Sequence, residues 1–306
     1  MSASHETAAR STTTGAANDA TTTGRPTAAQ ATDAPEASVP PARRPNDLAR
    51  QLTVAVSAVL AVVGSFIGSG AAGGTPIQDA AGGALAADAT PIAPGTGAFS
   101  IWSVIYFGLL AYAVWQFLPA QRTAERHRRV GYPVAASLLL NAAWILSIQF
   151  DVLWLSIPII AVLLGVLVVA FLTLLRWRPA NALDALVTDG TVGLYLGWVS
   201  IATAANVTAG LVAAGFDGWG MGADAWAVVV LAVAGLVGVA IAVRGGGRIA
   251  PTLSLCWGLT WVAIARLDGN LLSTPAAIAA IVAVVVVVIA TILARARLML
   301  RGEQPK

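Results

Sequence analysis

The sequence predicts an all-α protein, a polytopic bundle of about eight transmembrane helices. Hydrophobic residues make up 57% of its 306 residues, and charged residues only 11%. Apolar stretches that reach the roughly 17–25 residues needed to cross a bilayer recur along most of the chain. Basic residues gather at alternate ends of these stretches. A helix suits this setting because it satisfies every backbone hydrogen bond within one segment, which lipid cannot do.

Residues 1–45 differ from the rest of the chain. They are rich in Thr, Ala, Pro and Ser and contain no apolar run. Such a segment buries too little surface to offset its conformational entropy, so we expect a disordered cytoplasmic tail. We expect no signal peptide, because the apolar core of about 7–15 residues that one requires is missing.

Eight spans are predicted after this tail. They lie at 52–72, 99–118, 133–150, 152–175, 186–207, 225–243, 249–266 and 275–294. The third and fourth spans are separated by so few polar residues that they should form a tight hairpin.

Charge sets the orientation of these spans. One side of the membrane receives 15 basic residues, and the other receives only Arg266 together with six aspartates. The basic set is Arg43, Arg44, Arg50, Arg122, Arg126, Arg128, Arg129, Arg176, Arg178, Arg244, Arg248, Arg295, Arg297, Arg301 and Lys306. The positive-inside rule therefore puts both termini in the cytoplasm of a cell whose plasma membrane the chain spans. Basic residues at membrane edges point to lipid headgroups, not to nucleic acid, as their partner.

The chain has few of the residues that bind metals or catalyse hydrolysis. The chain has one cysteine, Cys256, within a span, and two histidines, His5 in the tail and His127 in a cytoplasmic loop. We therefore expect no metal site, no cofactor and no Ser–His–Asp enzyme. Gly68, Gly70 and Gly73 match G-x-G-x-x-G, but the motif ends a span, so close helix packing is favoured over dinucleotide binding.

The loop 73–98 is the longest between spans and faces outward. Its Gly, Ala, Pro and Thr content predicts little regular structure. It is either a flexible lid over an outward pocket or a long turn. The lack of any aromatic residue before Phe99 favours the turn.

The second and third spans carry candidate binding residues. Trp102 and Tyr106 share a helical stripe, although Trp102 is also placed as a membrane-interface anchor would be. Asn141 lies near the middle of the third span, where an amide must find a hydrogen bond. It is therefore either a contact between helices or a contact to a ligand, and Trp144 lies one turn further along.

Two acids, Asp184 and Asp189, lie at the cytoplasmic entry to the fifth span. We expect them to pair with Arg176 and Arg178 across a short loop, and a proton or ion relay is the second interpretation.

Residues 193–206 of the fifth span form two opposed stripes at 100° per residue. Tyr195, Trp198, Ala202 and Asn206 make a candidate pocket wall. Opposite them, Gly193 and Gly197 leave room for another helix to approach closely. In the last three spans Trp257 and Trp261 share a face, and residues 276–293 predict a lipid-facing wall without chemistry.

Three motifs together resemble the TspO/MBR family of tryptophan-rich sensory or translocator proteins. They are Phe-x-x-Trp-x-x-x-Tyr at 99–106, Leu-x-Leu-Asn-x-x-Trp at 138–144, and Tyr-x-x-Trp-x-x-x-Ala-Thr-x-x-Asn at 195–206. The resemblance covers about residues 52–207. It implies a TspO-like five-helix transmembrane domain at 46–210. The three further spans depart from the family pattern and are expected to form a three-helix transmembrane extension, with a short cytoplasmic tail, at 211–306.

The resemblance also implies a pocket for a hydrophobic small molecule such as a tetrapyrrole. By motif, its lining would be Trp102, Tyr106, Asn141, Trp144, Tyr195, Trp198, Ala202, Thr203 and Asn206. The function we expect is a membrane receptor or carrier, with a homodimer left open. An ion-coupled transporter that uses the two acids is the alternative, and light-dependent porphyrin breakdown is a third.

Overall fold

The computed structural model describes residues 44–68 and 75–301, which belong to one compact unit, Pro40–Lys306. The predicted tail therefore lies outside the described residues, apart from its last two. The described residues contain eight helices that are long and apolar enough to cross a membrane, as predicted. The helices of the first half are α1 (Pro45–Gly68), α2 (Ile101–Trp115), α3 (Glu125–Gln149) and α4 (Leu153–Arg176). Those of the second half are α6 (Thr191–Ala213), α7 (Ala223–Arg244), α8 (Ile249–Asp268) and α9 (Thr274–Leu300).

The fifth span begins earlier than predicted. A short helix, α5 (Ala182–Asp184), leads through a π-helical turn, η3 (Ala185–Gly190), into α6. The Asn181 side chain accepts a hydrogen bond from the Asp184 backbone amide at 2.9 Å, which caps this start. Asp184, at the end of α5, is buried, and Asp189, in the π-helical turn, is 12% exposed.

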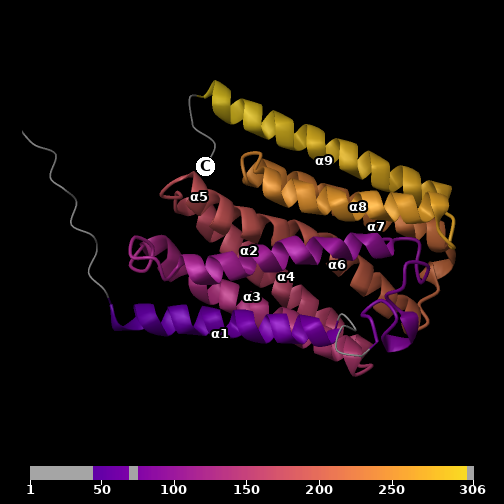
Figure 1. The fold of residues 1–306 in the computed structure, drawn as a ribbon. Helices are drawn as coiled ribbons and strands as arrows, with labels where there is room; N and C mark the ends of the chain where they lie inside the picture. The colour runs from indigo at the N-terminus through magenta and orange to yellow at the C-terminus, as the bar shows by residue number, and fades with distance from the viewer. Residues whose placement is uncertain (1–43, 69–74, 302–306) are drawn as a thin grey trace, which may run out of the picture. The chain divides into compact units, whose positions relative to one another are not determined.

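Neighbouring helices pack in a continuous series (Figure 1). α1 contacts α3, α3 contacts α4, α4 contacts α6, α6 contacts α8, and α9 contacts both α7 and α8. The α3–α4 hairpin turns at Asp151, whose φ of 58° allows the tight reversal that the sequence predicted. Gly68 of α1 lies directly against Ile145 of α3, which confirms its use in packing; Gly70 and Gly73 lie outside the described residues.

The glycine stripe of α6 meets α8. A Cβ added at Gly197 would lie 2.1 Å from the Pro251 carbonyl oxygen, and one at Gly193 would lie 2.9 Å from Ala250. The prediction of close helix approach is therefore confirmed. The predicted division at residue 210 falls within one continuous hydrophobic core, because α8 contributes Leu255, Leu259 and Val262 to it.

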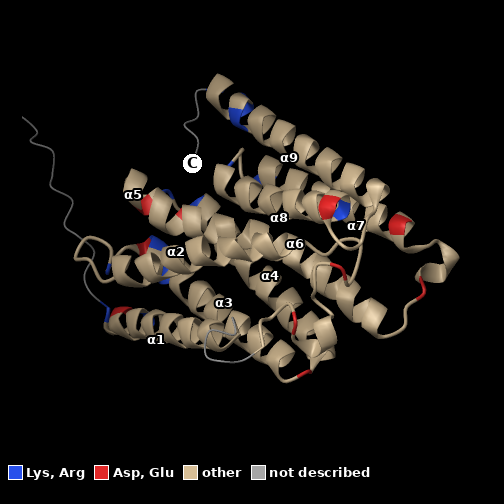
Figure 2. Cartoon of the chain, turned by 45° about the vertical axis from the view of Figure 1, so that its right-hand side comes forward, with Lys and Arg blue, Asp and Glu red and all other residues tan. Residues whose placement is uncertain are grey.

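Charges follow the ends of the helices. Figure 2 shows basic residues at the end of the bundle that holds the start of α1 and the end of α9.

α9 exposes Ile281, Val285 and Ile289 on one face, as expected of a lipid-facing wall. Its other face buries Ala283 and Val287 against Gly235 and Gly238 of α7.

Candidate functional site

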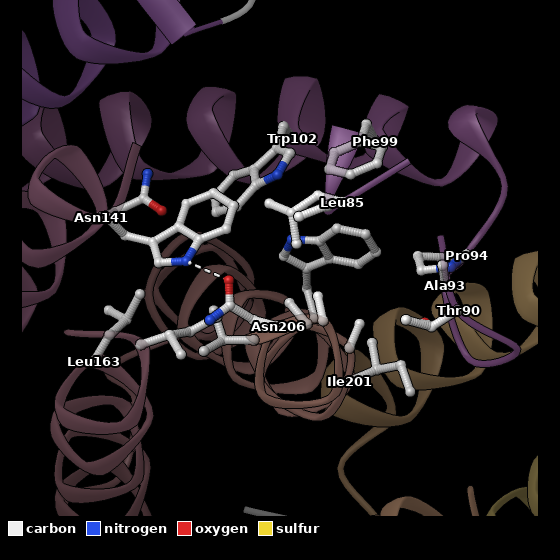
Figure 3. A pocket seen from close by; sticks show the side chains of 18 residues that line it. Leu85, Thr90, Ala93, Pro94, Phe99, Trp102, Asn141, Leu163, Ile201 and Asn206 are labelled. Atoms are coloured by element: carbon white, nitrogen blue, oxygen red, sulfur yellow. Dashed lines mark hydrogen bonds between the residues drawn. The ribbon is translucent and has the colours of Figure 1, made fainter. Parts of the chain in front are cut away.

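An aromatic cavity lies between α2, α3, α4, α6 and the segment that precedes α2. Its volume is about 50 Å³. Phe99, Trp102, Trp144 and Trp198 supply its aromatic rings, and Asn141 and Asn206 supply its amides (Figure 3). The Trp198 ring packs edge-on against Phe99 at 6.0 Å and against Trp102 at 6.2 Å between centroids. Such edge-to-face pairs stabilise the wall beyond the area they bury.

Three buried polar atoms in the cavity wall have no hydrogen-bond partner among the described residues. They are Oδ1 of Asn141, Nε1 of Trp198 and Oγ1 of Thr90. The other amide atom of Asn141, Nδ2, donates to the Tyr106 hydroxyl at 2.6 Å. Asn141 therefore contacts another helix, which confirms the first interpretation of this residue, and its Oδ1 is left as an unpaired acceptor in the cavity wall. A buried group left unpaired costs about 1–3 kcal/mol, so a molecule that pairs with these atoms gains from doing so.

Both polar atoms of the Asn206 side-chain amide are hydrogen-bonded. Its Oδ1 accepts from Trp144 Nε1 at 3.1 Å, the bond dashed in Figure 3, and its Nδ2 donates to Ser156 Oγ at 2.9 Å. Asn206 thus joins α3, α4 and α6 while it lines the cavity.

Six of the nine predicted site residues line this cavity. They are Trp102, Asn141, Trp144, Trp198, Ala202 and Asn206. The other three, Tyr106, Tyr195 and Thr203, do not. Tyr195 is buried and donates to the Ser137 carbonyl at 3.2 Å, and Thr203 donates to the Val199 carbonyl of its own helix at 2.7 Å. Tyr106 lines a neighbouring groove instead. The helical stripe correctly grouped Trp198, Ala202 and Asn206, but it could not show that Tyr195 points toward α3.

The neighbouring groove, of about 460 Å³, lies between α1, α2 and α3. Phe99, Trp102 and Trp144 line both the groove and the aromatic cavity. These three rings therefore form the partition between the two spaces.

The segment before α2 supplies residues that the sequence analysis did not select. Leu85, Thr90, Ala93 and Pro94 line the cavity (Figure 3), so the favoured interpretation of this loop as a plain turn was incomplete. The apolar run Ile92-Ala93-Pro94, with Ile92 buried, is the signal in the sequence that could have indicated it.

The two acids have different partners from those predicted. Arg126 of α3 contacts both Asp184 and Asp189, and Arg248 contacts Asp189 at 2.5 Å. The expected pairing with Arg176 and Arg178 is therefore wrong, because both of those side chains are exposed while the acids turn inward. Burial lowers the pKa of the Arg248 guanidinium, and Asp189 opposes that shift by favouring the charged form.

His127 also lies elsewhere than expected. It is in α3, not in a loop, and is fully buried. Its Nε2 lies 3.0 Å from the Gln121 side-chain oxygen and 3.5 Å from Asp184 Oδ1. The acids, Arg126 and His127 thus form a buried polar network at the basic end of the bundle.

Comparison with known families identifies the chain. The family described as TSPO-like protein matches residues 55–293. The chain belongs to the TSPO-like family. The match runs beyond the three motifs and through most of α9, so the last three helices belong to the TSPO-like region as well. No curated protein and no solved structure matches the chain.

Proposed function

We propose that this TSPO-like protein binds a hydrophobic small molecule in the aromatic cavity and acts as a membrane receptor or carrier. The observation that supports this proposal is a buried, ring-lined cavity with an unpaired acceptor on Asn141 and an unpaired donor on Trp198. Ligand sites commonly combine apolar and aromatic walls with a few fixed polar groups of this kind.

The ligand class follows from these walls. A flat apolar molecule would stack on the indole rings, while one hydrogen-bond donor and one acceptor on it would pair with Asn141 and Trp198. A tetrapyrrole has this chemistry, with pyrrole N–H donors and carboxylate acceptors on a flat ring. It is far larger than a cavity of about 50 Å³. Binding it would therefore require the partition formed by Phe99, Trp102 and Trp144 to move, so that cavity and groove join.

The membrane context belongs to the same proposal. We place the chain in the plasma membrane with both termini in the cytoplasm, on the strength of the basic residues gathered at one end of the bundle (Figure 2). A ligand that enters from the lipid or from outside would then reach the cavity at the end of the bundle opposite the basic residues.

The geometry gives less support to the ion-coupled transporter. Asp184 and Asp189 are paired with Arg126 and Arg248 within the described structure, and a carrier acid must be able to exchange its proton or ion. We therefore favour ligand binding over ion coupling.

Titration of the purified full-length protein with protoporphyrin IX, followed by tryptophan fluorescence, tests the proposal. Trp198→Phe keeps an aromatic ring but removes the free N–H, so affinity should fall by about 2–10-fold, the value of one hydrogen bond. Trp154→Phe is the matched control, because Trp154 is 71% exposed and absent from the cavity wall. Lack of saturable binding by a panel of tetrapyrroles and sterols would refute the proposal, and so would equal affinity in the wild type and Trp198→Phe.

A further inference from the structure

The segment that forms the outer wall of the cavity has little regular structure and is nonetheless buried. Thr90, Ile92 and Ala93 are at most 5% exposed. A buried loop must find partners for its backbone carbonyl groups, because helix or sheet bonds do not satisfy them. The partners of this segment therefore decide what holds the wall in place.

Arg266 of α8 supplies two of these partners. Its Nη1 donates to the Thr90 carbonyl at 2.9 Å, and its Nη2 donates to the Ala87 carbonyl. Arg266 is only 1% exposed, so its guanidinium donates to the loop and not to solvent. Thr90 links Arg266 directly to the cavity, because its backbone carbonyl accepts from Arg266 and the same residue lines the cavity.

Two tryptophans of α8 hold the other end of the segment. Trp257 Nε1 donates to the Ala98 carbonyl at 3.0 Å, and the Trp261 carbonyl accepts from the Gly95 amide at 3.1 Å. The Trp261 ring lies against Gly97, where an added Cβ would come within 2.1 Å of Cη2. Within the described residues, the hydrogen bonds that tie segment 84–98 to elements distant in sequence end on α8.

We propose that α8 positions the cavity wall, so that Arg266, Trp257 and Trp261 are positioning residues for ligand binding although none of them completes the aromatic wall itself. This inference rests on the proposed function. It gives the C-terminal helices a role, because α8 packs on α9 and on the glycine stripe of α6. A displacement of α8 would reach the ligand through segment 84–98.

Amide hydrogen exchange of residues 84–94 in the full-length protein tests the positioning without any ligand. Arg266→Met removes both donors, and exchange of this segment should become about tenfold faster or more, as one charged hydrogen bond implies. Arg266→Lys keeps the charge and some donors, so the exchange rate of residues 84–94 in this variant should lie between the rates in Arg266→Met and in wild type. Arg244→Met, at the exposed end of α7, is the matched control and should exchange as wild type.

Gly97→Ala tests the same contact from the loop side. The added methyl group would push the segment from Trp261, so exchange should rise as in Arg266→Met. Gly165→Ala is its control, because no atom lies within 4 Å of a Cβ there. If Arg266→Met does not fold, the comparison of Gly97→Ala with Gly165→Ala still tests the positioning role of α8.

Protoporphyrin IX titration of the same variants tests the link to binding. Affinity should fall about 3–10-fold in Arg266→Met and Gly97→Ala, and remain unchanged in the controls. Wild-type exchange rates in folded Arg266→Met and Gly97→Ala would overturn the positioning role. Faster exchange with unchanged affinity would overturn the link to binding. Failure of the wild type to bind protoporphyrin IX would count against the proposed function, while the exchange rates would still decide whether α8 holds the segment.

Discussion

Replacing Gly197 with alanine tests the contact between α6 and α8. A Cβ at this position would lie 2.1 Å from the Pro251 carbonyl oxygen and 2.2 Å from Ser254 Oγ. Ordinary contact begins at 3.4 Å, so the two helices would have to separate by about 1 Å locally. The carbonyl belongs to the backbone of α8 and cannot rotate away as a flexible side chain could.

The expected magnitude combines two opposing effects. Overpacking a close contact costs about 1–3 kcal/mol, whereas alanine gains about 1 kcal/mol over glycine in a helix. Gly197→Ala should therefore lower the free energy of unfolding by up to about 2 kcal/mol, a fall of a few degrees in melting temperature.

Thermal melting of the purified variant, with size-exclusion chromatography to check its integrity, measures this effect. Gly165→Ala serves as the control, because its added methyl group meets no atom within 4 Å and it should melt at or above wild type. Gly64→Ala is intermediate, since its Cβ would make an ordinary 3.4 Å contact with Ala142. A Gly197→Ala protein that melts as high as Gly165→Ala, which has the same helix-propensity gain without the clash, would show that α6 and α8 are not in the contact described.

Further predictions concern the polar contacts and the topology. Asn206→Ala should lower stability by about 1–3 kcal/mol, because it leaves the Trp144 N–H buried without an acceptor; thermal melting measures the loss. Asp189→Asn should lower stability by about 3–5 kcal/mol, because it leaves the buried Arg248 facing a neutral amide; chemical or thermal unfolding measures this. Reporter domains fused to either terminus should be cytoplasmic, and one inserted at 214–222 should be exterior, by the positive-inside rule.

Each of these predictions has its own control or contrary outcome. Asp151→Asn, at the exposed α3–α4 turn, should change stability little, and equal losses at positions 151 and 189 would contradict the ion-pair argument. Full stability in Asn206→Ala would mean that Trp144 finds another acceptor. A C-terminal reporter outside the cell, with the N-terminal reporter inside, would contradict the even number of spans, and both reporters outside would contradict the orientation.

The sequence alone determined the eight helices, their order and the family. Each span is a local property, because the length of the apolar run sets whether a helix can cross the bilayer. The glycine stripe at 193 and 197 was equally local: small residues one turn apart create a groove whichever helix fills it. The same periodicity placed Trp198, Ala202 and Asn206 on one wall.

Only the tertiary structure decided which groups meet. Asp189 could have paired with any nearby arginine, and the choice of Arg126 and Arg248 depends on how α3 and the turn before α8 are rotated toward α6. The stripe on α6 also could not separate Trp198, which lines the cavity, from Tyr195, which bonds to α3. The role of segment 84–98 was hidden for the same reason. Its wall position depends on Arg266, about 180 residues away in the chain, and a hydrogen bond over that separation leaves no periodicity for the sequence to display.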